Sequence, residues 1–180
     1  MRHTADGTTA MADWWQQYRA RARDADAVTV ELFLRSYTPT GHHLDRSALV
    51  ESVTERVEDG GLDGYDVTVV GDRICVCDRC TELYAEEDTF ESVAALAEWR
   101  SGPLEASGIT ERAVESAITG EYHHTISLPE QALGVFVDDA LVGVFPCTDG
   151  VRTYEPATFL SERQERAERA DAGQSEPVSD

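Results

Sequence analysis

AVTVELFLRSY, residues 27–37, is the stretch that decides the fold. Apolar side chains occupy alternate positions in it, which is the period of a β-strand; they are Val28, Val30, Leu32 and Leu34. After the turn-rich TPTGHH, the segment from Arg46 to Glu58 repeats apolar residues every four positions, with Asp45 as a helix cap. We expect a first strand followed by a first core helix.

The middle of the chain predicts a second strand and a second helix. The run YDVTVVGDRICVC, residues 65–77, is rich in β-branched residues and predicts a bent strand or a hairpin, which we place parallel to the first strand. Asp88 and Glu91 form a capping-box pair before a second core helix that ends at residues 101–103. Residues 104–128 are compatible with a short helix or with a strand, and periodicity leaves both open.

The end of the chain predicts a hairpin and a last helix. In ALGVFVDDALVGVFP, residues 132–146, two apolar runs are joined at Asp138-Asp139, which is typical of an antiparallel hairpin. A final amphipathic helix is expected from about Ala157 to Arg169.

The predicted order of elements, β-α-β-α-β-β-α, is that of a thioredoxin-like α/β sandwich of two or three layers. Its sheet would have the order second, first, third and fourth strand. Pro129 precedes the third strand, where that fold usually has a cis proline. A ferredoxin-like α+β sandwich is the alternative, and it would need residues 110–119 or 65–77 to supply another strand.

The domain organisation follows from composition and length. A chain of 180 residues is long enough for one domain with its own core. We place that single α/β domain at 27–170 and an accessory helix, with Trp14 and Tyr18 four residues apart, at 11–26. Residues 1–10 and 171–180 have the composition of disordered ends.

The charge is extreme, because 35 acidic residues face 15 basic ones and give a formal charge of -20. The sequence contains no lysine, so all the basic residues are arginine. Such a charge repels itself in dilute buffer, but at about 1 M salt the screening length falls to roughly 3 Å. We expect a halophilic cytoplasmic protein with no membrane span and no secretion signal.

The loop after the first strand is where thioredoxin-like oxidoreductases carry a Cys-x-x-Cys motif. Here the loop contains no cysteine, which excludes dithiol exchange at that position. Any activity there would be ligand binding through side chains of the loop and of the proline expected beside it. The candidate ligand-binding residues are Tyr37, Thr40, His42, His43 and Pro129.

A second candidate site is the C-x-C-x-x-C array of Cys75, Cys77 and Cys80. Thiolates at this spacing can hold zinc when a fourth ligand is near, or Cys77 and Cys80 can form a reversible disulfide. In the predicted sheet Cys147 lies on the opposite edge, about 14 Å from Cys77, so it cannot share a metal with the array.

The residues near the array affect both its possible zinc binding and its possible redox role. His42 or His43 would lie at the same end of the predicted sheet as the array and could supply the missing ligand. A redox role is disfavoured, because no basic residue other than Arg79 is adjacent to these thiols to lower a thiol pKa. His123 and His124 are expected in an exposed loop. Zinc is the cofactor that the array suggests, although the overall expectation is that the protein needs none.

Three segments carry a resemblance to a known family: the strand at 28–37, the segment 117–121 and the closing LVGVFPCTDG at 141–150. They are similar to a family of small haloarchaeal proteins labelled helix-turn-helix domain proteins. The resemblance implies DNA binding and transcription regulation. A DNA-binding form would need exposed basic residues and a two-fold homodimer. The candidate nucleic-acid residues are Arg19, Arg21 and Arg23 of the accessory helix.

The acidic composition weakens DNA binding, since phosphate contacts also lose strength steeply as salt rises. The helix at 46–58 precedes DGGLDG and a strand rather than a second helix. We therefore expect a non-enzymatic binding or regulatory module that acts on a protein or small ligand. DNA-binding regulation is the first alternative, and thiol-redox or zinc chemistry at the cysteine array is the second.

Overall fold

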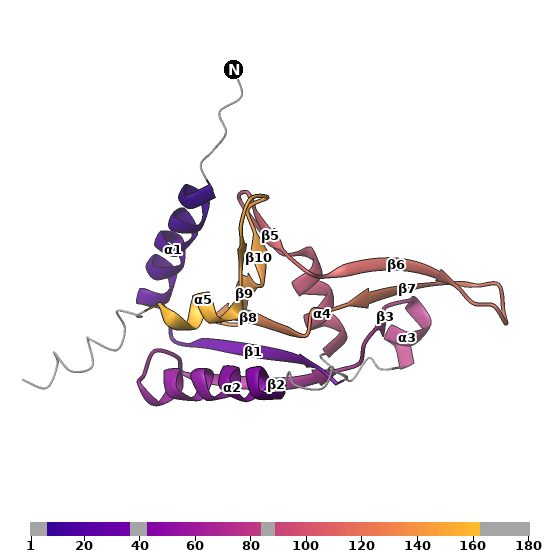
Figure 1. Ribbon diagram of the computed structural model, residues 1–180, viewed down its shortest axis with the longest axis horizontal. Helices are drawn as coiled ribbons and strands as arrows, with labels where there is room; N and C mark the ends of the chain where they lie inside the picture. Colours follow the sequence, from indigo (N-terminus) through magenta and orange to yellow (C-terminus); the bar gives the residue numbers. More distant parts are fainter. Residues whose placement is uncertain (1–6, 37–42, 84–88, 163–180) are drawn as a thin grey trace, which may run out of the picture.

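The computed structural model describes residues 7–36, 43–83 and 89–162 (Figure 1). Its main sheet has four strands in the order β2-β1-β8-β9. The strands are β1 (Val28–Arg35), β2 (Gly64–Val70), β8 (Gln131–Val137) and β9 (Ala140–Phe145). β1 pairs with β2 in parallel and with β8 antiparallel, and β8 pairs antiparallel with β9. The α/β class and the predicted sheet order are therefore confirmed, whereas the thioredoxin-like assignment stays a prediction.

The crossover between the parallel strands β1 and β2 contains α2 (His43–Glu58). It buries Leu49 and Val53, and the hydroxyl groups of Thr54 and Tyr65 are 3.1 Å apart, which places α2 over the face of the sheet that carries Tyr65. On the opposite face lies α4 (Thr89–Glu98), whose Leu96 approaches Gly134. The apolar side chains of β1 fill the space between sheet and helices.

The hairpin between β8 and β9 turns at Asp138 and Asp139, as the sequence predicts. Both residues have positive φ, 48° and 65°, which is the backbone conformation of a two-residue type I′ turn. Asp138 Oδ1 also accepts hydrogen bonds from the backbone N–H groups of Asp26 and Ala27, at 2.9 and 3.0 Å. The turn thus also holds the start of β1.

An aromatic cluster fixes α1 (Gly7–Asp24) and α5 (Pro156–Ser161) to the main sheet. The ring of Trp15 stacks on Phe159 at 5.6 Å, and Trp14 Nε1 donates a hydrogen bond to the Val142 carbonyl at 2.9 Å. A Cβ on Gly143 would lie 2.6 Å from the Trp14 ring, so glycine is required beneath that ring. α1 starts at Gly7, inside the segment expected to be disordered, and buries Ala10.

Two smaller sheets were not predicted. One has the order β11-β10-β5-β4 and the other the order β3-β7-β6. Their strands are β3 (Ile74–Cys75), β4 (Arg100–Ser101), β5 (Leu104–Ala106), β6 (Thr110–Glu115), β7 (Tyr122–Ser127), β10 (Cys147–Thr148) and β11 (Thr153–Tyr154). The segment 104–128, for which periodicity left both helix and strand possible, therefore contains strands. The run 65–77 is divided between two sheets. Since 110–115 and 74–75 pair with β7 rather than with the main sheet, the ferredoxin-like alternative is wrong.

Other expectations are corrected in detail. The cis peptide bond precedes Pro146, after β9, and not Pro129. The last helix, α5, ends at Ser161, and the expected tail at 171–180 lies outside the described residues. In the described ranges, no helix combines the length and the apolar character that crossing a bilayer requires.

Replacing Trp14 by alanine is expected to lower the free energy of unfolding by about 3–5 kcal/mol, because it empties a buried site and removes a hydrogen bond. Urea unfolding followed by circular dichroism at high salt measures this loss. Gln16→Ala, on the exposed side of α1, is the matched control and should change stability little. Equal losses in both variants would contradict the anchoring role of Trp14.

Candidate functional site

The three cysteines of the C-x-C-x-x-C array converge at one point. Cys75 ends β3, Cys77 directly precedes α3 (Asp78–Leu83), and Cys80 lies in the first turn of α3. All three are free thiols and half-buried, and their Sγ atoms lie within 4.8 Å of one another. The Sγ atoms of Cys75 and Cys77 are 3.3 Å apart. The array is therefore a cluster, hereafter the thiol cluster.

His123 lies beside the thiol cluster because of the register of β3 and β7. Ile74 pairs with Ile126, and Cys75 pairs with Thr125. The backbone N–H of Val76 donates to the His124 carbonyl at 2.8 Å, which continues the same register. Cys77 therefore lies opposite His123, on the side of the ribbon that also carries Cys75.

The sequence-based placement of the two histidines in an exposed loop is wrong. They belong to β7, where His123 is half-buried and His124 is exposed. The β-branched residues Thr125 and Ile126 next to them were the available signal for a strand. The sequence alone does not reveal the register between β3 and β7, which brings the His123 side chain toward Cys77.

Hydrogen bonds favour the thiolate form of Cys77. A hydrogen bond from the His123 side chain, followed by bonds from the backbone N–H of Cys80 and from Cys75, lowers the pKa of Cys77 to about 6. Conversely, its hydrogen bonds with Cys75 and Cys77 raise the pKa of Cys80 to about 12. The expectation that Arg79 alone could lower a thiol pKa here is therefore wrong, since His123 has the largest effect.

The fourth cysteine, Cys147, is not part of the thiol cluster. It lies in β10 with 1% of its surface exposed. Burial raises the pKa of its thiol to about 12, so it is a neutral core side chain. Its thiol serves packing rather than chemistry.

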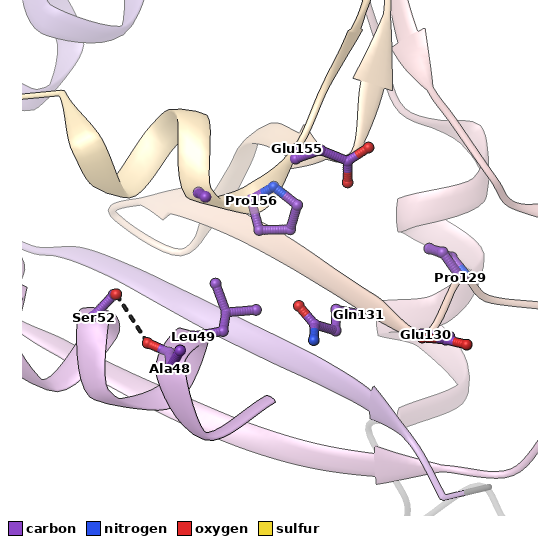
Figure 2. A pocket seen from close by; sticks show the side chains of 9 residues that line it. Ala48, Leu49, Ser52, Pro129, Glu130, Gln131, Glu155 and Pro156 are labelled. Carbon is purple, nitrogen blue, oxygen red and sulfur yellow. Dashed lines mark hydrogen bonds between the residues drawn. The ribbon is translucent and has the colours of Figure 1, made fainter. Parts of the chain in front are cut away.

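The candidate ligand site beside Pro129 is only partly within the described residues. Tyr37, Thr40, His42 and the side chain of His43 lie outside them. Pro129 borders a cavity of about 550 Å³ (Figure 2), whose walls come from α2, the start of β8 and the start of α5. The lining includes the carboxylates Glu130 and Glu155 and no described cationic side chain, which disfavours an anionic ligand.

The three arginines of α1 do not form one patch. Arg19 lies 5.7 Å from the Trp15 ring and pairs with Glu162 at 3.5 Å. Arg21 and Arg23 are exposed in the last turn of α1. Two residues along a helix correspond to about 200° of rotation, so their side chains leave α1 on opposite sides.

Two consecutive helices do occur in the described residues, but they do not include the helix at 46–58 that was considered from the sequence for a helix-turn-helix. α2 is followed by β2, as expected, whereas α3 is followed by α4. The exposed positions of α4 include Glu91 and Glu98, and those of α2 include Glu51, Glu55 and Glu58. These carboxylates would repel phosphates, so neither described helix has a groove-facing basic surface.

In the metal-free protein, alkylation of Cys77 is expected to rise to a plateau with a midpoint near pH 6, because the thiolate is the nucleophile. Peptide mapping by mass spectrometry separates Cys77 from the other thiols. His123→Ala removes a hydrogen bond to the thiolate and should move the midpoint to higher pH. His124→Ala is the control, and a shift of the same size in that variant would refute the role of His123.

A family of proteins described as having a helix-turn-helix domain matches residues 22–168 of the chain. Comparison with curated proteins and comparison with solved structures each gave no match. The family match spans all the described strands and every described helix except most of α1. The chain belongs to the helix-turn-helix domain family.

Proposed function

We propose that this protein regulates transcription by binding DNA, and that it acts through binding rather than catalysis. The family match over residues 22–168 is the observation that carries the proposal, since a helix-turn-helix is a DNA-binding motif. The protein would act in a cytoplasm of high salt, where its charge of -20 is screened.

The C-terminal end of α1 is the surface that we assign to DNA contact. Arg21 and Arg23 are exposed there, whereas Arg19 is held by Glu162 and Trp15. A helix seated in the major groove has a phosphate strand on each side, so arginines that leave α1 on opposite sides can each reach a phosphate. The acidic exposed positions of α2 and α4 would then face away from the duplex.

A homodimer would strengthen such a surface. One protomer offers few basic side chains, and phosphate contacts lose affinity steeply with salt. Two copies related by a two-fold axis would present two α1 ends to two half-sites of one duplex, which doubles the number of contacts. Light scattering with and without duplex measures this stoichiometry.

Binding to a labelled mixed-sequence 30-base-pair duplex is expected to weaken as KCl rises, with a linear relation between the logarithms of affinity and salt. In the double variant Arg21→Glu with Arg23→Glu, the slope should fall by about one unit for each lost phosphate contact. Fluorescence anisotropy at several KCl concentrations measures both quantities.

The matched control is Arg73→Glu with Arg100→Glu, which changes the net charge by the same amount at two arginines that are 57% and 62% exposed elsewhere. It should alter the slope less than the α1 variant does. The proposed contact surface is wrong if both double variants weaken binding equally. DNA binding itself is wrong if the unaltered protein binds no duplex at any KCl concentration.

A further inference from the structure

The sheet β3-β7-β6 and the helix α3 form an outer lobe that has almost no apolar core. Figure 1 shows the β6–β7 ribbon extending away from the main sheet, with β3 and α3 beside it. α3 buries no residue, and every residue of β6 is exposed. In β7, Ile126 is the buried residue. Apolar burial therefore does little to hold α3 against the ribbon.

The thiol cluster lies where these elements meet. Cys77 directly precedes α3 and Cys80 lies in its first turn, while Cys75 belongs to β3 and His123 to β7, so the four side chains come from all three elements at the junction. Small domains with too little core are commonly held together by a disulfide or a metal. The positions of the sulfur atoms at this junction indicate whether a disulfide or a metal holds the outer lobe together.

The sulfur positions fit a metal better than a disulfide. Zinc–sulfur bonds of about 2.3 Å at tetrahedral angles place the sulfur atoms about 3.8 Å apart. In the thiol cluster one pair is 3.3 Å apart and all three sulfur atoms lie within 4.8 Å, so small shifts reach that geometry. A disulfide would join two of the three sulfur atoms at about 2.05 Å and leave the third unused.

His123 is the candidate fourth ligand. It lies opposite Cys77 in the strand register, and its side chain is close enough to lower the pKa of that thiol. Its ring nitrogens do not lie within 4.8 Å of all three sulfur atoms, so the imidazole has to shift toward the thiol cluster to coordinate. A metal ion between them would replace the shared proton, because the same nitrogen can coordinate once it is deprotonated. His124, its neighbour, is exposed on the other side of β7 and cannot substitute.

We propose that Cys75, Cys77, Cys80 and His123 form a structural zinc site that ties α3 to the β6–β7 ribbon. Three thiolates and one neutral imidazole complete a closed tetrahedral site, which is typical of structural rather than catalytic zinc. Soft sulfur ligands favour zinc over magnesium or calcium. Binding releases the protons of those thiols that are still protonated, and no sulfur is oxidised.

The backbone prepares the site before the metal arrives. The N–H of Cys80 donates to the sulfur of Cys77, and the N–H of Thr81 donates to the Cys77 carbonyl at 2.9 Å. These bonds set the first turn of α3 so that Cys77 and Cys80 face the same side. An N–H donor to a ligand sulfur also orients it and partly neutralises its charge.

Cobalt titration of the full-length protein tests the site. Protein treated with chelator and a phosphine reductant should bind one Co²⁺ per chain with the intense visible absorption of tetrahedral thiolate coordination, and Zn²⁺ should displace it. His123→Ala should shift the visible bands and weaken Co²⁺ binding by more than the roughly 10- to 100-fold that loss of an outer partner costs. His124→Ala should leave both unchanged.

A second readout tests the structural role. Zn²⁺ should slow trypsin cleavage after Arg79 in α3 and Arg112 in β6, while tryptophan fluorescence, which reports the buried Trp14, Trp15 and Trp99, stays the same. Cys77→Ser should abolish this protection with the tryptophan signal intact. Cys147→Ala should keep a stoichiometry of one.

Three results would overturn the proposal. The first is that reduced protein binds no Co²⁺ at a small molar excess. The second is that the affinity and spectrum of His123→Ala equal those of the unaltered protein, which would exclude His123 as a ligand. The third is that protein isolated without reductant carries no metal and has a mass lower by two hydrogen atoms, with peptide mapping that places the disulfide within the thiol cluster.

Discussion

The pairing of β1 on both of its edges is the constraint on which the rest of the structure depends. β1 pairs with β2 in parallel, and parallel neighbours require a crossover, which α2 supplies. On its other edge β1 pairs with β8, whose hairpin to β9 brings Gly143 beneath Trp14. Val30 and Phe33 point to opposite faces of β1 and are each 1% exposed, so both faces of this sheet must be covered.

The outer lobe, unlike the main domain, is not stabilised mainly by apolar packing. Its strands are hydrogen-bonded to one another, but β6 and α3 bury no residue, so Ile126 of β7 supplies most of the apolar burial in the ribbon. Zinc held by Cys75, Cys77, Cys80 and His123 would supply the missing attachment. The lobe would then be conditional on metal, whereas the main domain, held by apolar packing and an aromatic cluster, would not. With such a division, metal availability would change one surface of the protein without unfolding the rest.

Local sequence patterns predicted the elements of the main domain, but they could not predict the pairing register of strands that lie far apart in the chain. The alternation in 27–37 and the Asp138-Asp139 turn are local signals, and they gave β1 and the β8–β9 hairpin correctly. The segment 104–128 is compatible with the period of a helix and with that of a strand, and it forms strands because β6 and β7 pair with each other. The cysteine array was visible from its spacing, but His123 was not, because its position opposite Cys77 is fixed by β3 pairing with a strand far along the chain.

The DNA contact that we propose lies at the C-terminal end of α1, and the proposed metal site lies in the outer lobe, so the two proposals concern separate surfaces. X-ray absorption at the zinc edge, on protein isolated from zinc-supplemented cells, tests the metal site most directly. The predicted first shell has three sulfur atoms at about 2.3 Å and one nitrogen at about 2.0 Å. A shell of nitrogen and oxygen alone, or protein that retains no zinc after gel filtration, would contradict a zinc-held outer lobe.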